Sequence, residues 1–195
     1  MSKLAFVLVA VALPLTAVAA PESYTLDPYH TYPNFEVNHL GYSKMRGRFD
    51  KSAGKFSIDR AAKSGSLELT VQTASITTGD NDKGNRPRAR DEHLRAADFF
   101  NVAEFPTMVY KAATVKFSGD NVSSLEGNLT LLGLTKPLAL TVDNWKCGPH
   151  PVSKKEMCGA NAHGTFKRSD FGMKYGIPAV GDEITLWVEV EAYKD

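Results

Sequence analysis

The stretch RDEHLRAADFFNVAEFP, residues 90–106, decides how the rest of the chain is organised. It is the one long segment without strand-like alternation in a sequence that otherwise alternates like β-structure. Leu94, Ala97 and the Phe pair that follows recur every three or four residues, which predicts a short helix with one apolar face. Pro106 ends this segment. A short amphipathic segment between two blocks of strands predicts a cap over the opening of a β-barrel, with its aromatic side chains turned inward.

Strand-like alternation continues on both sides of this segment. Upstream, residues 35–39 and 67–71 alternate between apolar and polar side chains, and residues 125–132 and 184–193 do so downstream. Turn signals separate about eight such runs, one of these turns being at residues 50–53. Such a series of consecutive strands predicts an all-β domain, either an antiparallel barrel or a sandwich.

The first residues have the features of a secretory signal peptide. Lys3 supplies a positive charge, residues 4–13 form an apolar core too short to span a membrane, and residues 17–19 (Ala-Val-Ala) match a cleavage site. The sequence thus predicts a signal peptide at residues 1–19 and one exported domain at residues 20–195, with 22 basic and 22 acidic residues. This balance gives no electrostatic reason to expect nucleic acid as a partner, and no other apolar run is long enough for stable membrane insertion.

The two cysteines of the chain are Cys147 and Cys158. In an exported protein a disulfide is the expected pairing, and the ten residues between them, GPHPVSKKEM, read as a long hairpin loop that such a bond would hold. The alternative is a metal site in which His150 or His163 joins the cysteines, although this cysteine spacing is unusual for zinc.

Common catalytic motifs are absent from the sequence. It contains no G-x-S-x-G, H-E-x-x-H or G-x-G-x-x-G pattern and no phosphate-binding loop. An enzyme would have to use His, Asp or Glu side chains alone. We therefore predict that the protein is not an enzyme, and that it has no catalytic residue, metal or cofactor of its own.

Three histidines could nevertheless form a polar site. His39 shares a strand face with Phe35, so its side chain should point inward, and His93 in the cap could meet it at one mouth of the barrel. Together with His30 they could bind a metal or act as an acid–base pair. The alternative is that His30 and His39 are buried, hydrogen-bonded supports for the cap.

A basic cluster precedes and enters the cap, and it consists of Lys83, Arg86, Arg88, Arg90 and Arg95. The planar guanidinium group can donate two hydrogen bonds to one phosphate, so a pyrophosphate headgroup at the barrel mouth would suit this cluster. The alternative is a solvated loop whose charge is offset by its acidic neighbours, which are Asp80, Asp82, Asp91 and Glu92.

Most of the many aromatic and aliphatic side chains must simply form the core. The functional interpretation is that those facing inward line a tunnel, in which a long prenyl chain would be held by apolar burial alone, at about 25 cal/mol per Å². The residues predicted to contact such a ligand are His30, Phe35, His39, Phe49, Arg90, Asp91, His93, Leu94, Phe99, Phe100, Leu129, Leu131, Phe166, Leu186 and Val188.

Four pieces of the sequence, in this order, carry a resemblance to a known family. They are YTLDPYHTYPNFEVNHLG followed by MRGRF, then RDEHLRAADFFNVAEFP, LEGNLTLLGLTKPLALTV and GTFKRSDFGMKYGIPAVGDEITLWVEVEA. In these pieces the chain resembles the YceI-like family of bacterial periplasmic polyisoprenoid-binding proteins. The resemblance covers nearly all of the exported domain. The family commonly has Ser where this chain has Thr31, and the insert that carries Cys147 and Cys158 is not general in it.

This resemblance implies a lipocalin-like, eight-stranded antiparallel barrel with a short helical cap and a long apolar interior. It also implies a periplasmic binding protein that sequesters or transports a polyisoprenoid lipid, of the polyprenyl phosphate or isoprenoid quinone type. Homodimers can form in a family of this kind. Two alternatives remain open at this point: a small enzyme acting on such a lipid through His39, His93 and Asp91, and a stress-response interaction module with a filled barrel.

Overall fold

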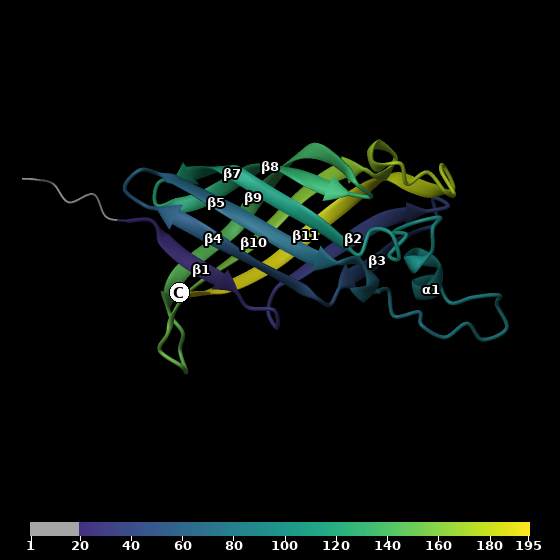
Figure 1. The fold of residues 1–195 in the computed structure, drawn as a ribbon, viewed down its shortest axis with the longest axis horizontal. Coiled ribbons are helices and arrows are strands. Elements are labelled where there is room, and N and C mark those ends of the chain that lie inside the picture. The colour runs from purple at the N-terminus through teal and green to yellow at the C-terminus, as the bar shows by residue number, and fades with distance from the viewer. Residues whose placement is uncertain (1–19) are drawn as a thin grey trace, which may run out of the picture.

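Eleven β-strands follow the alternating segments of the sequence in the computed structural model, which describes residues 20–195. Figure 1 shows them from the side as one elongated barrel. The signal peptide predicted at residues 1–19 lies outside the described residues. The strands are β1 (Glu22–Leu26), β2 (Tyr32–His39), β3 (Ser43–Phe49), β4 (Ser52–Asp59), β5 (Ser64–Gln72), β6 (Ile76–Thr77), β7 (Thr107–Ser118), β8 (Asn121–Leu131), β9 (Leu134–Pro149), β10 (Glu156–Lys167) and β11 (Val180–Lys194).

These strands occupy only eight positions around the barrel, because three positions are interrupted. β1 and β2 pair with successive halves of β11, so they are two pieces of one strand position, broken at residues 27–31. In the same way β3 and β4 share the next position, and β5 and β6 the one after it. All pairs are antiparallel, and the ring closes where β11 meets β1 and β2. The predicted eight-stranded antiparallel barrel is confirmed.

The prediction of a turn at residues 50–53 is wrong. Ser52 and Ala53 belong to β4, and the chain continues from β3 into β4 in the same direction after a short break. The backbone N–H of Asp50 donates to the carbonyl of Ser75 across this break, at 3.1 Å. The polar residues that resembled a turn are therefore a local interruption of one long strand.

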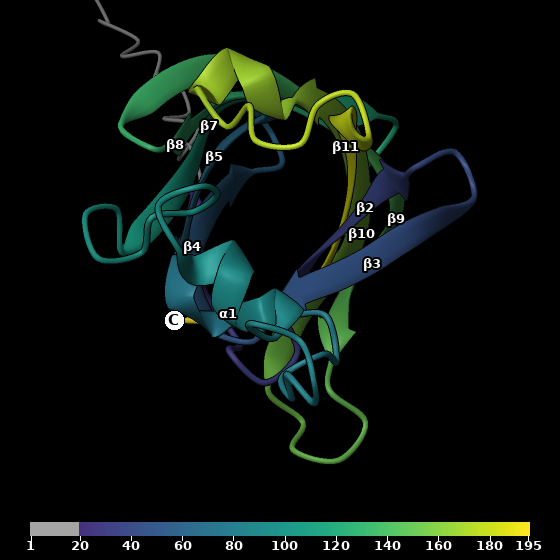
Figure 2. The same cartoon turned by 90° about the vertical axis from the view of Figure 1, so that its right-hand side faces the viewer.

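The cap is built from α1 (Arg90–Arg95) and the turns that follow it up to residue 105. Figure 2 looks at the end of the barrel that carries α1 and the hairpin joining β2 to β3. The helix is shorter than the apolar spacing of the segment suggested. It ends in a turn where the backbone N–H of Ala96 donates to the carbonyl of His93, at 3.0 Å. The short helix and the tight turns after it together direct the apolar side chains of the cap, such as Leu94, Phe99 and Phe100, toward the barrel interior.

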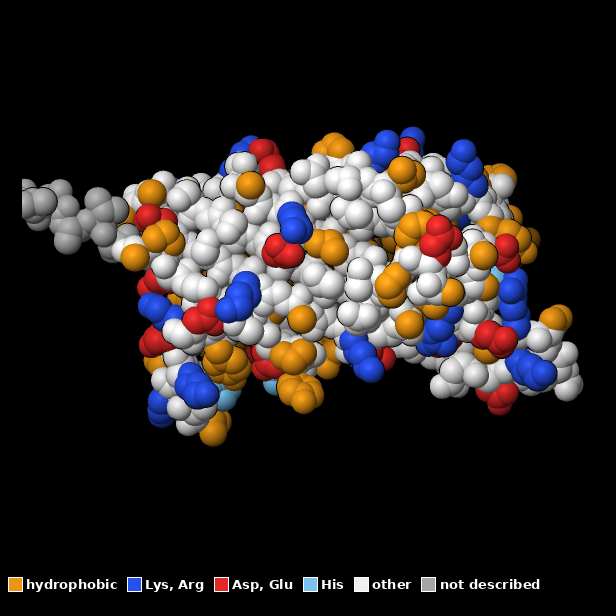
Figure 3. Space-filling view, viewed as in Figure 1, with side chains coloured by type: hydrophobic (Ala, Val, Ile, Leu, Met, Phe, Trp, Pro, Cys, Tyr) orange, Lys and Arg blue, Asp and Glu red, His pale blue; other side chains and the backbone are white. Residues whose placement is uncertain are grey.

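The outer surface mixes charged and apolar side chains. On the face in Figure 3, Lys and Arg lie close to Asp and Glu, and hydrophobic side chains are scattered among them. Within residues 20–195, none of the helices has the length and the apolar character that crossing a membrane requires.

Candidate ligand-binding site

An apolar cavity begins under the cap and runs into the barrel, and we call it the cap chamber. It encloses about 1190 Å³ of space not filled by atoms, including the part that opens to solvent. Side chains from both the cap and the strands line it. Ten of the residues predicted to contact a ligand are among them: Phe35, Phe49, Leu94, Phe99, Phe100, Leu129, Leu131, Phe166, Leu186 and Val188.

Aromatic contacts join the cap to the barrel wall at this cavity. The ring of Phe49 lies 5.9 Å from that of Phe35 and 5.4 Å from that of Phe100, the second pair being edge-to-face. Gly47 makes this possible, because a Cβ atom there would lie only 2.5 Å from the ring of Phe35. The glycine in the strand therefore gives the ring its place at the cavity wall.

The lining of the cap chamber offers no free polar side-chain group among the described residues. Only Tyr110 and Arg168 bring side-chain nitrogen or oxygen atoms to it. The Tyr110 hydroxyl donates to the carbonyl of Leu138 at 3.0 Å, and burial raises the pKa of Tyr110 to about 12. Arg168 is 2% exposed, and burial lowers its pKa. Its guanidinium donates to three backbone carbonyl groups at 2.8 to 3.0 Å, those of Met173, Val180 and Gly181.

The start of the cap is fixed by a buried carboxylate. Asp91 is 1% exposed and accepts hydrogen bonds from the backbone N–H and the hydroxyl of Thr78, at 2.9 and 2.5 Å. Arg90 donates to the same hydroxyl at 2.7 Å and lies 3.6 Å from Asp80, with about a third of its side chain exposed. Asp91 thus holds the cap in place, whereas Arg90 keeps part of its guanidinium at the surface.

His93 lies at the rim of the cap, against aromatic rings. Its ring packs edge-to-face against Phe99 and Tyr175, with centroids 4.9 and 5.1 Å away. Its Nε2 atom is 3.0 Å from a carboxylate oxygen of Asp98, which also accepts from Arg88. The hydrogen bond from His93, and then that from Arg88, lowers the pKa of Asp98. This arrangement links α1 to the turn that follows it.

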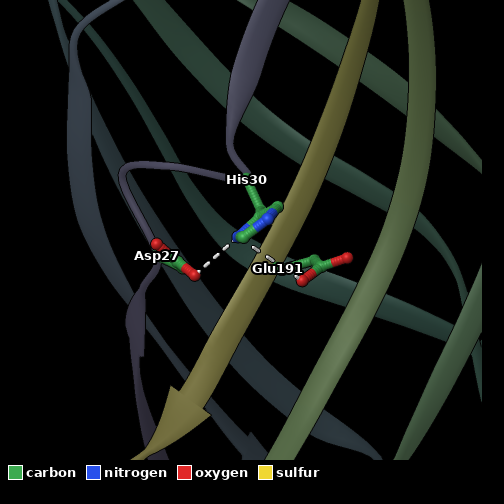
Figure 4. A group of neighbouring side chains, drawn as sticks. All are labelled: Asp27, His30 and Glu191. Atoms are coloured by element: carbon green, nitrogen blue, oxygen red, sulfur yellow. Dashed lines mark hydrogen bonds and ion pairs between the residues drawn. The ribbon is translucent and has the colours of Figure 1, made fainter. Parts of the chain in front are cut away.

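His30 lies far from the cap, at the outer surface of the barrel between β1 and β2. Figure 4 shows its ring between the carboxylates of Asp27 and Glu191. The Nδ1 atom is 2.8 Å from Asp27 and 4.0 Å from Glu191, and the hydrogen bond with Asp27 raises the pKa of His30. These three side chains form the one group within residues 20–195 whose possible metal-ligating atoms come within 4.8 Å of one another.

The structure therefore does not bring the three histidines together. His30 is an exposed residue near the start of β2, and His39 ends that strand, opposite Ser43 and Val180 in the register of the sheet. His39 is half-buried and is not part of the cavity lining, unlike Phe35 on the same face. The predicted three-histidine site is not formed. The alternative, in which His30 and His39 are buried supports for the cap, is wrong for His30, which is exposed.

Cys147 and Cys158 form a disulfide, as predicted, and the alternative metal site with His150 or His163 is therefore wrong. The two residues lie directly opposite each other in the β9–β10 pair, near the end of the barrel away from the cap. His150 accepts backbone N–H groups in the hairpin loop, and His163 pairs with Asp143 at 2.6 Å on the outer surface. These two histidines therefore have local structural contacts.

Sequence reasoning did not single out Tyr110 or Arg168. A tyrosine in an alternating strand looks like any core aromatic, and its hydroxyl partner Leu138 is 28 residues away. Arg168 follows an alternating strand and precedes the glycine-containing segment to which it donates hydrogen bonds. Its position at the end of a strand was the only signal in the sequence, and it does not distinguish Arg168 from a surface residue. Both require the three-dimensional pairing of distant segments.

Fold and cavity together define a capped, hollow β-barrel of the lipocalin-like type. A sequence profile described as the YceI-like domain matches residues 24–192. Protein YceI of Salmonella arizonae is 34% identical over 177 residues, which cover 90% of this chain and 88% of the relative. The chain belongs to the YceI-like family.

Solved structures agree with this assignment. The YceI protein of Campylobacter jejuni is 27% identical, with a TM-score of 0.64 over 81% of this chain and 90% of the other. Two more distant proteins share the fold. They are BcnA of Burkholderia cenocepacia, with 20% identity and a TM-score of 0.68 over 85% of this chain and 98% of the other, and a polyisoprenoid binding domain from Saccharophagus degradans, with 16% identity and a TM-score of 0.64 over 89% and 99%.

Proposed function

We propose that this protein is a periplasmic binding protein that sequesters or transports a polyisoprenoid lipid, of the polyprenyl phosphate or isoprenoid quinone type. The observation that carries the proposal is the cap chamber, whose polar side-chain atoms are all bonded to the backbone. Such a lining favours hydrocarbon by about 25 cal/mol per Å² of apolar surface removed from water. It disfavours polar ligands, because a buried polar group without a partner is costly.

Two further points support the class of ligand. The same fold serves as a polyisoprenoid binding domain in Saccharophagus degradans. The chemistry of the interior fits binding better than catalysis, because it presents no free acid, base or nucleophile to a bound chain. The open cavity also argues against a filled barrel that acts only as an interaction module.

The polar headgroup would remain at the cap end, where Arg90, His93 and His39 lie outside the apolar lining. Arg90 is the strongest candidate, because its side chain at the start of α1 is partly exposed and its guanidinium is always charged. We expect a phosphate-bearing headgroup to bind more tightly than a neutral one for a chain of the same length.

Native mass spectrometry of the protein purified from periplasm, followed by organic extraction, tests the main proposal. A bound species whose mass contains repeating isoprene units is the expected result. A protein that carries no lipid, and that binds none when prenyl lipids are added, would refute it.

Substitution of Arg90 tests the headgroup contact. Arg90→Glu should weaken binding of a prenyl diphosphate by about tenfold or more, or about 1.4 kcal/mol, and leave a ubiquinone of equal chain length nearly unaffected. Lys155→Glu is the matched control, because it makes the same charge change at an exposed site in the loop between β9 and β10, away from the cap. Equal losses for both ligands would assign Arg90 a structural role.

A further inference from the structure

A second apolar cavity lies deeper in the barrel, toward the end away from the cap, and we call it the base chamber. It contains about 570 Å³ of space not filled by atoms, including any part that opens to solvent, which is about half the volume of the cap chamber. Its lining includes Phe56, Ile58, Val122, Trp145 and Cys158. Among the residues of its lining only serines contribute hydroxyl groups, so it too is suited to hydrocarbon.

The two chambers are in line and share part of their walls. Four residues line both cavities, and we call them the partition: Leu67, Leu125, Ala162 and Val190. They come from four different strands, and β5 and β10 stand on opposite sides of the ring. The partition therefore lies at the boundary between the two chambers, with Leu67 and Ala162 on opposite sides of the barrel.

Three of the partition side chains retain accessible surface although they face inward. Leu67, Leu125 and Val190 are half-buried and pack against the buried core. Since they line the two chambers, the surface that they expose is the surface of the barrel interior. An apolar surface of this kind is stabilised when a hydrocarbon chain covers it.

Ala162 is the smallest side chain of the partition, and it is 6% exposed. The register of the β9–β10 pair shifts by one residue between Asn161 and Ala162, so a bulge lies at this level of the wall. Any larger side chain at position 162 would extend into the gap between the two chambers. Of the four partition positions, 162 is therefore the one where a larger side chain adds most to the volume already present.

Aromatic and disulfide-bonded residues stand at the far end of the base chamber. Phe56 stacks on Tyr24 with 4.5 Å between ring centroids, and its edge meets Trp145 at 5.9 Å. Cys158 is bonded to Cys147 on the neighbouring strand. These contacts hold the end of the chamber in one geometry, which gives the interior a defined length.

We propose that the base chamber is a subsite for the terminal isoprene units of a long polyisoprenoid chain, and that Ala162 determines which chain lengths the barrel accepts. This inference rests on the proposed function, since it assumes a prenyl ligand in the cap chamber. A short chain fills the cap chamber alone. A long chain enters by the cap, passes the partition over Ala162, and adds its end to the base chamber.

The experiment compares farnesol, a short prenyl alcohol, with solanesol, a long one, on the full protein. Trp145 lines the base chamber, so its fluorescence reports on that chamber. The other tryptophan, Trp187, is partly exposed on the outer face and is removed by using a Trp187→Phe background. Solanesol should change the emission of Trp145, and farnesol should bind without that change. The blocking variant is Ala162→Phe, and Asn161→Phe is its matched control, because Asn161 is exposed on the same strand.

We expect Ala162→Phe to weaken solanesol binding by about tenfold or more while farnesol binding stays within about twofold. Asn161→Phe should change neither. If Ala162→Phe does not show the circular dichroism of the wild type, Ala162→Leu takes its place, with a smaller loss in the same direction. Retained farnesol binding shows that the cap chamber is intact.

Two results overturn the inference while leaving the proposed function standing. One is undiminished solanesol binding in the folded blocking variant, and the other is an equal loss of both ligands. Failure of the wild type to bind either alcohol would instead count against the proposed function itself.

Discussion

The disulfide between Cys147 and Cys158 should contribute a large share of the stability of the barrel. The bond closes a loop with a sequence separation of 11 residues. In the chain-entropy model, a loop of this length removes enough freedom from the unfolded state to stabilise the fold by about 3 kcal/mol. For a domain of this size, with a urea dependence of about 2–3 kcal/mol per M, this corresponds to a shift of about 1 M in the unfolding midpoint.

The assay is urea-induced unfolding, followed by far-ultraviolet circular dichroism, of the wild type and of the double variant Cys147→Ala/Cys158→Ala. Alanine is preferred to serine because Cys158 is 1% exposed and a hydroxyl group there would be buried. Reductant should lower the midpoint of the wild type to near that of the double variant and should not affect the variant. This comparison separates the covalent bond from the packing of the sulfur atoms.

A small effect would refute the reasoning. If the double variant and the reduced wild type lose less than about 0.5 kcal/mol, the cross-strand hydrogen bonds of β9 and β10 already restrict this loop in the unfolded ensemble. If the double variant is less stable but reductant does not change the unfolding midpoint of the wild type, the loss of stability comes from packing around Cys158.

Two further predictions concern charged groups. Glu22→Gln should destabilise the protein at neutral pH, because the hydrogen bond from Lys194, together with one from Arg60, lowers the pKa of Glu22 from 4.5 to about 2. That stabilisation is present above pH 4.5 and is lost as the pH falls toward about 2. The free energies of unfolding of the wild type and of Glu22→Gln should therefore converge near pH 2. A difference that stays constant with pH would contradict this prediction. Arg168→Met should lower the free energy of unfolding by about 3 kcal/mol or more, because it removes the hydrogen bonds to three backbone carbonyl groups, one at a buried position and two at partly buried ones. The exposed Lys167→Met should have little effect. A loss below about 1 kcal/mol in thermal or urea unfolding would show that water replaces the guanidinium.

Much of the barrel could be predicted from the sequence, because apolar and polar side chains alternate along a half-buried strand and this period of two is visible in the sequence. Residues 184–193 show this in β11, where Ile184, Leu186 and Val188 line the cavity and Trp187 faces outward. The inward turn of Phe99 and Phe100 was likewise predictable from their spacing after Leu94. These features depend on neighbouring residues only.

Features that depend on the pairing of distant segments could not be predicted in this way. The early end of α1 is one example: Asn101 adopts a left-handed backbone conformation, with φ of +42°, in the turns that replace a longer helix. The location of His30 is another. The break at residues 27–31 places it at the outer surface, beside Glu191 of β11.

The three strand breaks lie on neighbouring positions of the ring, at residues 27–31, 50–51 and 73–75. They form one line across the wall, bridged by single hydrogen bonds such as those from Asp50 to Ser75 and from Gln72 to Lys51. The other five positions are unbroken strands of 11 to 16 residues. Local opening requires less free energy where ladder hydrogen bonds are fewer. The barrel therefore has one compliant side and one stiff side. Amide hydrogen exchange should be fastest along the line of the three strand breaks, where the wall can deform to admit a bulky ligand.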